Sequence, residues 1–382
     1  MKERLHVLLM PSYYPAPESP ATGLFMRDLA RAISSRNEVT VLAPASAASA
    51  PDAVVDGIRT MRIPERRRLD RVAALHRLEW LWRTLSHLRR EGSPVDVVHA
   101  HYFNTGASAV VVGSARGLPV VVTENQSKHT TGDLSAYETH LARFTYRRAA
   151  LVCPVSPLME NCLRVLEPSG RYEVVPDVVD IDAFAALRRQ SADAPAGRIL
   201  AVSNLIRRKG LGDLIEAVRL LVADGRDVSL TVVGEGPERG ALETQARGLP
   251  VELVGALPRA EVAKSLQHGD VFAMPTLGDP FGIAAVEALS AGVPVVMTDA
   301  VGSADLLEPL GARIVRPGDP VALRDAIVEC LQNPNSVPSG AVDVLRRYCG
   351  LAAIGERLNA IYRSLPSIDV EVTTSVRERP PE

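Results

Sequence analysis

The chain has 382 residues, of which 46% are apolar and 23% are charged, and its formal net charge is −2. This length exceeds one ordinary hydrophobic core and predicts two domains of about 150 to 200 residues each. A net charge so close to zero argues against nucleic acid as a partner, because bulk electrostatic attraction would be missing.

Cysteine usage and the start of the chain indicate the compartment. The four cysteines are scattered, with no C-x-x-C pair and no metal-ligand spacing, so we expect free thiols in a reducing cytoplasm and no metal. The N-terminus enters a predicted strand without a signal peptide, and no apolar run reaches the about 18 residues of a membrane span. We therefore expect a cytoplasmic protein that could also bind peripherally to the inner membrane face.

Short apolar runs alternate with helical patterns, which is typical of parallel sheets covered by helices. The first series of predicted strands covers 5–10, 39–43, 95–100, 120–123, 151–155 and 173–176. The second series covers 198–203, 228–233, 251–254, 271–274, 293–297 and 313–315. The predicted fold class is α/β, with two Rossmann-like, doubly wound parallel-sheet domains facing a cleft.

A small, polar and Pro-containing segment at 191–197 predicts the hinge between the two series. We therefore assign 1–185 to the first domain and 186–345 to the second. A helical pattern follows over 340–365. We assign 346–366 to a C-terminal helix that is expected to pack back toward the first domain. Residues 367–382 are expected to form a disordered tail.

Three stretches of the first domain are less regular. The loop 11–24 is rich in Pro, Tyr and Ser, and its length favours a ligand-contacting loop over a plain connection. The small-residue stretch 43–57 is predicted to be a surface loop. The stretch 59–90 has ten arginines and both tryptophans, and from Leu69 its apolar residues recur at helical spacing. Such a basic amphipathic helix could touch anionic lipid, although the pattern favours a solvated face over a packed apolar stripe.

Glu287 is the only charged residue between Asp279 and Asp299, inside a predicted helix over 282–291. Most of its neighbours one turn away are small, and a buried carboxylate without a partner costs several kcal/mol. Either an arginine from elsewhere in the core or the hydroxyls of a ligand would serve as that partner. The Pro-Phe-Gly turn before the helix presents free N–H groups and the positive end of the helix dipole, which suits an anionic ligand.

A second candidate segment, SNLIRRKG, lies between the predicted strand 198–203 and a predicted helix over 213–222. Lys209 carries a compact positive charge, and the guanidinium of Arg208 offers two parallel N–H donors. Both are suited to binding a diphosphate at the carboxyl end of that strand. A solvated basic turn is the alternative, chiefly for Arg207.

These segments resemble the donor domain of the retaining family 4 glycosyltransferases (glycosyl transferases group 1), which have the two-domain GT-B architecture. The resemblance rests on SNLIRRKGLGDLIEA, VVGEGPERGALE, VELVGALPRAEV and DVFAMPTLGDPFGIAAVEALSAGVPVV, in this order within 198–327. The first domain is similar more loosely, through Gly23, VDVVHAHY, PVVVTEN, LVCPVSPLM and VVPDVVDIDAF.

The resemblance implies that the second domain binds a nucleotide diphosphate-sugar and the first domain binds the acceptor. Lys209, with Arg208, would hold the diphosphate, Glu287 would bind the ribose and Asp279 would contact the donor sugar, which makes these four the catalytic group. Further donor-binding residues would be Gly23, Asn204, Leu257, Arg259, Phe281, Gly282 and Ile283. Candidates on the acceptor side, chosen by position, are Tyr13, Tyr14, Arg27, His101, Asn125, Lys128 and His129.

The chain departs from the family pattern at four places. The first of two glutamates separated by seven residues is Asp279, an arginine of the basic motif is Asn204, and a histidine after TE is Asn125. The linker has Asp177-Val178 where Asn-Gly is usual. These departures concern the donor sugar more than the nucleotide.

The function that the resemblance implies is retaining transfer of a sugar from a UDP- or GDP-sugar to an acceptor hydroxyl, without a metal or other cofactor. The acceptor could be a small molecule, a glycan or a lipid-linked molecule. One alternative is a catalytically silent partner subunit that binds nucleotide sugar. The departures from the family pattern at Asp279, Asn204 and Asn125 are the reason to consider it. Another is a sugar-nucleotide epimerase, which would need more acidic and histidine side chains in the cleft.

Overall fold

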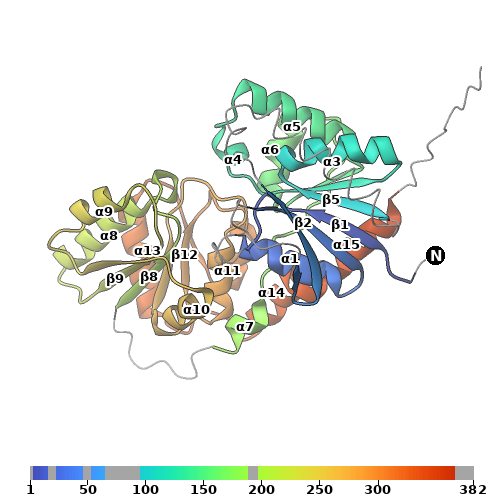
Figure 1. Cartoon of the computed structure of the whole chain (residues 1–382). Helices are drawn as coiled ribbons and strands as arrows, with labels where there is room; N and C mark the ends of the chain where they lie inside the picture. The colour runs from blue at the N-terminus through green and yellow to red at the C-terminus, as the bar shows by residue number, and fades with distance from the viewer. Residues whose placement is uncertain (1–2, 16–22, 46–52, 65–94, 188–196, 366–382) are drawn as a thin grey trace, which may run out of the picture.

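The computed structural model describes residues 3–15, 23–45, 53–64, 95–187 and 197–365. In this part of the chain, two β-sheets flanked by helices form two α/β domains that lie side by side (Figure 1). The predicted fold class is therefore confirmed.

The first sheet has seven strands in the order β3-β4-β2-β1-β5-β6-β7. Their bounds are β1 His6–Met10, β2 Glu38–Ala45, β3 Ala53–Val55, β4 Ile58–Pro64, β5 Val97–His101, β6 Val120–Glu124 and β7 Leu151–Pro154. All neighbouring pairs are parallel except β3 with β4. Every residue of β1, β5 and β6 is buried, because helices cover both faces of the sheet.

Two groups of helices cover the first sheet. On one face pack α1 (Leu24–Ser34) and the late helix α15 (Leu351–Ser364). On the other face pack α3 (Tyr102–Arg116), α5 (Ala136–Arg148) and α6 (Pro157–Leu166). The short helix α4 (Lys128–Thr131) follows β6.

The second sheet has six parallel strands in the order β10-β9-β8-β11-β12-β13. Their bounds are β8 Arg198–Val202, β9 Ser229–Val233, β10 Val251–Gly255, β11 Val271–Met274, β12 Val295–Thr298 and β13 Arg313–Val315. One face carries α8 (Leu211–Ala223), α9 (Arg239–Gln245) and α13 (Pro320–Gln332). The other carries α7 (Ile181–Ala185), α10 (Arg259–His268), α11 (Ile283–Ser290), α12 (Ala304–Leu307) and α14 (Ala341–Cys349). The single turns η1 (Arg207–Lys209) and η2 (Glu308–Leu310) complete the domain.

The structure corrects two predicted elements of the first domain. The predicted loop 43–57 contains β3, which forms a hairpin with β4. The hairpin turns at Asp56-Gly57, where both residues have positive φ of 51° and 75°, the conformation of a tight hairpin turn. The predicted strand 173–176 is absent, and only Tyr172 forms an isolated bridge to β7.

Other predictions fall on segments outside the described residues. These are the basic amphipathic helix from Leu69 to 90, most of the first loop, the hinge up to 196 and the tail 367–382. Among the described helices, none combines the length and apolarity that crossing a bilayer needs.

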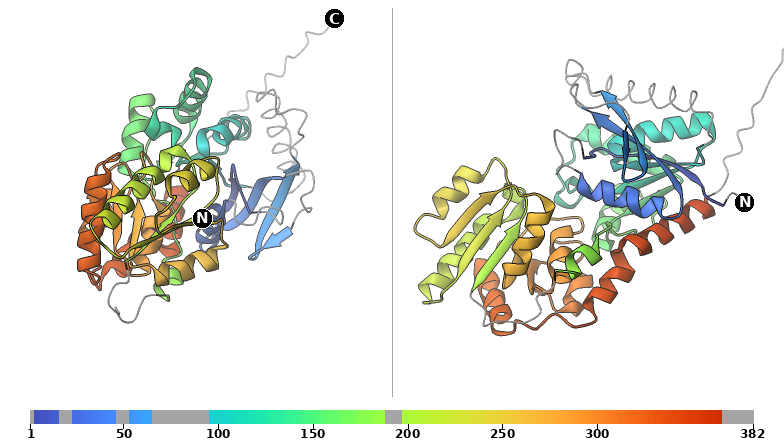
Figure 2. Two further views of the ribbon diagram at one scale, coloured as in Figure 1. Left: turned by 90° about the vertical axis from the view of Figure 1, so that its left-hand side faces the viewer. Right: turned by 60° about the horizontal axis from the view of Figure 1, so that its bottom comes forward.

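The helical pattern over 340–365 forms two helices, because Gly350 separates α14 from α15. The first, α14, packs in the core of the second domain, whereas α15 lies alongside α1 of the first domain (Figure 2). A side chain at Gly355 would clash with the carbonyl of Ala32, so this glycine lets α15 approach α1 closely. In addition, the Tyr362 hydroxyl lies 2.5 Å from Nδ1 of the buried His99 on β5.

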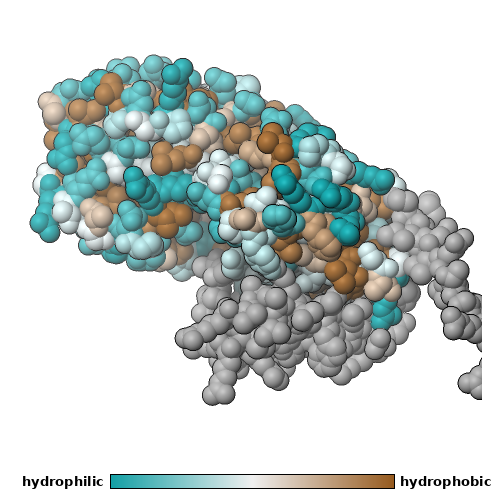
Figure 3. All heavy atoms as spheres, turned by 90° about the horizontal axis from the view of Figure 1, so that it is seen from above, coloured by the Kyte–Doolittle hydropathy of each residue, from teal (hydrophilic) through white to brown (hydrophobic). Residues whose placement is uncertain are grey.

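The linker helix α7 lies within 1–185, yet its Ile181 and Phe184 are buried in the core of the second domain. The chain therefore passes between the domains twice, once before the first strand of the second sheet and once between α14 and α15. On the face shown in Figure 3, hydrophobic side chains lie in small groups among hydrophilic ones, as on an ordinary solvated surface.

Candidate active site

A cleft of about 800 Å³ lies between the two domains. Its walls are the loops after the carboxyl ends of strands in both sheets, together with the N-terminal ends of α1 and α11. Ligands bind at this edge of parallel sheets, because loops and helix N-termini gather there.

The N-terminus of α11 forms part of the second-domain wall. Gly282 caps this helix with a φ of 89°, and a side chain here would clash with Val301, so the turn requires glycine. Among the described residues, no acceptor bonds the backbone N–H groups of Gly282, Ile283 and Ala284, which line the cleft. Three such donors at the positive end of a helix make a site for negative charge.

The basic turn η1 brings Lys209 to the same wall. The Lys209 ammonium lies 2.5 Å from Oδ2 of Asp279, and both side chains are largely buried, with 13% and 15% exposed. Oδ1 of Asp279 accepts a bond from the backbone N–H of Phe281, at 3.1 Å. Arg208 donates to the carbonyl oxygen of Gly278. Lys209 is thus held close to the N-terminus of α11 by a carboxylate that is itself oriented.

Glu287 lies one turn into α11 and is 13% exposed. Its partner is Arg259, whose Nη2 lies 3.4 Å from Glu287 Oε1 and whose Nη1 bonds to Asp28 of α1 in the first domain. Burial raises the pKa of Glu287 to about 7, although the nearby guanidinium opposes this shift. An arginine, one of the two kinds of partner that the sequence left open, is therefore present, and it links the two domains across the cleft.

Asp177 and Asn125 form a polar pair on the first-domain wall. The Asn125 amide donates to both carboxylate oxygens of Asp177, at 2.9 and 3.1 Å. Burial raises the pKa of Asp177 to about 7, the charge of Asp279 across the cleft adds to the shift, and the Asn125 bond opposes it. Next to them lies Tyr102, which has a φ of 68°, a strained conformation for a residue with a bulky side chain.

The structure brings together the catalytic and donor-binding residues predicted from the sequence. Those that line the cleft are Gly23, Asn204, Arg208, Lys209, Leu257, Arg259, Asp279, Phe281, Gly282, Ile283 and Glu287. Of the acceptor-side candidates, only Tyr13 and Asn125 line it. The roles of these residues stay predictions.

The other five acceptor-side candidates do not line the cleft, which corrects their predicted positions. Tyr14 is 4% exposed, with the Arg62 guanidinium over its ring, and Arg27 is bonded to Asp56 of the hairpin turn at 2.5 Å. Lys128 lies 2.6 Å from Glu138, and buried His129 lies 2.9 Å from the Tyr146 hydroxyl. His101 is buried behind the wall against Phe25 and Tyr102, and burial lowers its pKa to about 4.

Sequence reasoning assigned no site role to several cleft residues that follow strands or linkers, among them Tyr102, Gln126, Ser127 and Asp177. The first three come directly after β5 and β6, so the rule that ligands sit at strand ends would have found them. Asp28 was also missed, although it is an acid on the apolar face of α1 between buried Met26 and Leu29.

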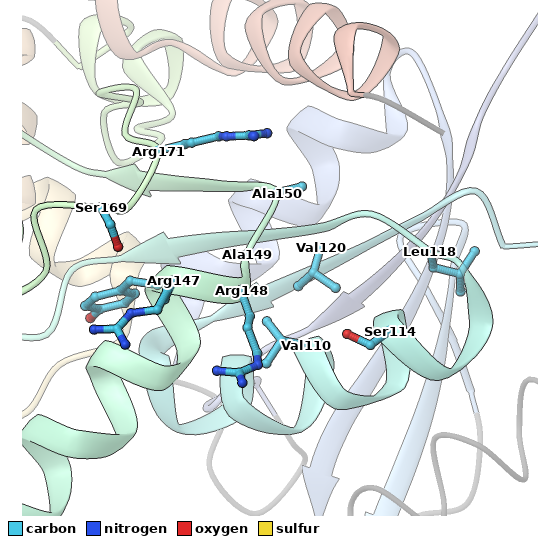
Figure 4. A pocket seen from close by; sticks show the side chains of 11 residues that line it. Val110, Ser114, Leu118, Val120, Arg147, Arg148, Ala149, Ala150, Ser169 and Arg171 are labelled. Atoms are coloured by element: carbon cyan, nitrogen blue, oxygen red, sulfur yellow. The ribbon is translucent and has the colours of Figure 1, made fainter. Parts of the chain in front are cut away.

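A second hollow of about 320 Å³ lies at the opposite edge of the first sheet (Figure 4). Its arginines do not converge, since Arg171 extends on the other side of the strand from Arg147 and Arg148. Arg147 lies 2.6 Å from Glu167, and Arg148 stacks on Phe144 at 4.3 Å. This hollow lacks the organisation of the cleft, which is therefore the candidate active site.

Comparison with known proteins gives a consistent result. The family described as Glycosyl transferases group 1 matches residues 196–333, and the family described as Glycosyl transferase 4-like domain matches residues 22–177. The phosphatidyl-myo-inositol mannosyltransferase of Mycobacterium tuberculosis (strain ATCC 25618 / H37Rv) is 30% identical over 309 residues, which are 77% of this chain and 79% of that protein.

Two solved structures share the fold. Sucrose-phosphate synthase from Thermosynechococcus elongatus superimposes with a TM-score of 0.78 and 18% identity, over 95% of this chain and 99% of that one. Anabaena Alr3699/HepE in complex with UDP superimposes with a TM-score of 0.72 and 19% identity, over 94% of this chain and 100% of that one.

Proposed function

We propose a specific reaction for this chain, which belongs to the family 4 glycosyltransferases (glycosyl transferases group 1) and has their GT-B architecture. It is a glycosyltransferase with a nucleotide diphosphate-sugar as its donor substrate. The reaction we propose is metal-independent transfer of the sugar to an acceptor hydroxyl, with retention of configuration at the anomeric carbon.

The observation that carries this proposal is that the Lys209 side chain lies close to the N-terminus of α11 on the same wall of the cleft. As the bond from the anomeric carbon to the diphosphate breaks, the sugar gains oxocarbenium character and the diphosphate gains negative charge. The Lys209 ammonium, Arg208 and the unbonded N–H groups of Gly282 to Ala284 would stabilise that charge. Since these groups already supply positive charge, the reaction does not require a metal ion.

Retention is proposed through attack from the face that the leaving group occupies. The acceptor oxygen forms a bond to the anomeric carbon while the bond to the diphosphate oxygen breaks. The proton of the acceptor hydroxyl passes to that leaving oxygen. When the diphosphate binds Lys209 in place of Asp279, the Asp279 carboxylate becomes free to accept a hydrogen bond from a hydroxyl of the donor sugar.

The remaining donor-side residues would bind the nucleotide. Glu287 would bind the ribose hydroxyls, with Arg259 stabilising its charge, and Leu257 and Arg259 would contact the base. Asn204 lines the cleft beside Lys209. Gly23 has a φ of 72° and packs against the backbone of Tyr13, and both residues line the cleft. The UDP complex of a protein with the same fold supports a UDP-sugar, and a GDP-sugar is the other donor we propose.

For the acceptor, the name of the mycobacterial relatives, phosphatidyl-myo-inositol mannosyltransferase, supports a lipid-linked acceptor at the inner face of the membrane. We accordingly propose a cytoplasmic enzyme with peripheral membrane contact. Co-sedimentation with liposomes containing phosphatidylinositol tests this part, and failure to sediment would favour a small soluble acceptor or a glycan.

Lys209→Ala tests the mechanism. Because it removes a charge that stabilises the leaving diphosphate, we expect kcat to fall about 10²- to 10³-fold. The matched control is Lys264→Ala, since Lys264 is exposed on α10, pairs with Glu261 and does not line the cleft. Near-normal turnover of Lys209→Ala would overturn the proposed role.

Thermal shift identifies the donor. Purified chain is screened against UDP, GDP, ADP and TDP and their common sugars, with and without a chelator. A shift with one nucleotide that the chelator leaves unchanged supports the proposal, and a shift that the chelator abolishes contradicts metal independence.

A further inference from the structure

We propose that Asp177, oriented by Asn125, binds a substrate hydroxyl at the site of sugar transfer. This inference rests on the proposed function and deepens it, because it adds a hydroxyl-binding pair on the first-domain wall. The hydroxyl belongs either to the donor sugar or to the acceptor, and the chemistry of recognition is the same for both.

The position of Asp177 is the first reason. It lines the cleft opposite Lys209 and Asp279, and it lies close enough to Asp279 for the two carboxylates to interact electrostatically. Asp279 is held by Lys209 on the second-domain wall. A sugar bound at the N-terminus of α11 would therefore have one carboxylate on each side.

The bonding of Asp177 is the second reason. Among the described residues, its carboxylate has no cationic partner, and its one side-chain donor is the Asn125 amide. A carboxylate offers about four acceptor sites, so about half of them are unfilled. Burying a charge this poorly paired is costly, which is expected where a ligand completes the bonding.

The neighbouring acceptors are the third reason. Oε1 of Gln126 is buried and has no hydrogen-bond partner in the described part of the chain, and the buried Oδ1 of Asn125 has only the His101 ring near it. The orientation of the Asn125 amide is fixed, because its NH₂ group faces the carboxylate. The wall thus presents several acceptors that lack donors.

A carboxylate beside buried amide oxygens favours a ligand that donates hydrogen bonds and carries no negative charge. A phosphate would be repelled by Asp177 and could fill none of the acceptors, whereas sugar hydroxyls supply the missing O–H donors. Asn125 supports the site as a neutral donor, which orients the carboxylate without neutralising it. Asp177 and Asn125 therefore act together, and they occupy two of the positions at which the chain departs from its family.

The test is Asp177→Asn, which keeps the shape of the side chain but removes its charge and acceptor capacity. Its matched control is Asp133→Asn, because Asp133 is exposed and outside the cleft. Calorimetry measures the Kd of UDP, UDP-glucose, GDP and GDP-mannose for both variants and the wild type. Turnover is measured without an acceptor, as donor hydrolysis, and with phosphatidylinositol vesicles or methyl α-mannopyranoside.

A donor-sugar contact predicts that Asp177→Asn binds the free nucleotide normally but loses 10-fold or more in affinity for the nucleotide sugar. An acceptor contact predicts normal affinity for both and normal hydrolysis, with the acceptor KM raised 10-fold or more. Asn125→Ala should change the same parameter by a smaller factor, and Asn125→Gln should restore part of it, as expected for a positioning residue.

If every parameter of Asp177→Asn stays within twofold of the wild type, the inference is wrong while the proposed function stands. If the wild type binds neither of the two nucleotides and neither of the two nucleotide sugars, the proposed function fails first and the inference falls with it. Asp177→Asn removes a buried charge, so misfolding is not expected. Asp177→Ser serves as a second variant with the same expected losses.

Discussion

At the scale of single residues, two buried carboxylates distinguish this site from the rest of the molecule. Burial raises the pKa of both Asp177 and Glu287 to about 7, and the two residues lie on opposite walls of the cleft. Ionising either carboxyl group in the folded chain costs stability, because the unfolded chain would ionise it more easily. Such a cost is typical of functional sites, where ligand contacts offset it.

The sign of this effect gives a prediction for Asp177. Its folded-state pKa lies above its ordinary value of 3.8, so between about pH 4 and 7 the folded state binds more protons than the unfolded state. Stability therefore falls as pH rises through that window, by up to about 1.4 kcal/mol per pH unit. Asp177→Asn removes this term, so its free energy of unfolding should exceed that of the wild type by more at pH 8 than at pH 5.

Urea unfolding at both pH values measures the difference, and Glu138→Gln serves as a control of opposite sign. The bond from Lys128 and the bonds within the Ser135 cap lower the pKa of Glu138 to about 2. Its contribution to stability is present above pH 4.5 and is lost as pH falls toward 2, so this variant should be less stable than the wild type at pH 8. An equal effect of Asp177→Asn at pH 5 and pH 8 would contradict the shift.

Sequence could predict which donor-side residues line the cleft, but it was less successful for the acceptor-side candidates. Lys209, Gly282 and Glu287 belong to contiguous motifs whose spacing fixes their geometry. On the acceptor side, position after a strand does not say where a side chain points. Arg27 and His129 were chosen by position, yet one bonds the hairpin turn and the other is buried in the core.

At the scale of elements, the N-terminus of α11 depends on one backbone conformation. Gly282→Ala would put a Cβ against Val301 and would force a non-glycine residue to a φ of 89°. We expect a loss of about 1–3 kcal/mol in unfolding free energy together with weaker binding of the nucleotide diphosphate, because the N–H donors would shift.

The matched control is Gly240→Ala on α9, where an added Cβ meets nothing within 4 Å and φ is not positive. There the free energy of unfolding should rise slightly, since alanine favours helix. Unfolding curves and calorimetry with UDP and GDP measure both variants. Normal nucleotide binding by a folded Gly282→Ala variant would argue against the α11 terminus as the anion site.

Strands that are buried on both faces were predicted more accurately than the β3–β4 hairpin at the edge of the first sheet. Strands such as β1 and β6 are built around short apolar runs because both faces of the sheet are covered, and these runs predicted the strands almost to the residue. The β3–β4 hairpin was missed because β3 is only three residues long and lies in a small-residue stretch. The Asp56-Gly57 pair was the signal that could have found it.

At the scale of the whole molecule, the two domains contact each other at the floor of the cleft. The Ser156 hydroxyl donates to the carbonyl oxygen of Pro280 at 2.7 Å, and Gly302 has no room for a side chain against these two groups. Val155 of the first domain is buried in the core cluster of the second. Together with the bond between Asp28 and Arg259, these contacts hold the two walls of the cleft in register.

The late helix α15 should stabilise the first domain, although more than 300 residues separate it from α1 along the chain. Leu358 is fully buried in the cluster that α15 shares with α1 and the first sheet. We expect Leu358→Ala to reduce the free energy of unfolding by about 2–5 kcal/mol.

Glu356→Ala, at an exposed ion pair with Arg36, is the control and should have little effect. Tyrosine fluorescence and urea unfolding of both variants measure this difference. A Leu358→Ala variant as stable as the control would show that α15 is dispensable for the first domain.

The placement of α15 also has a consequence for protein synthesis. A ribosome releases β1 to β7 and their early helices first, but this domain has to wait for residues 351–364 before its apolar surface is covered. The second domain, in contrast, has all its strands by residue 315. The nascent chain should therefore complete its domains in the reverse of their order along the chain, and the exposed face of α1 should be a binding surface for chaperones until α15 has emerged.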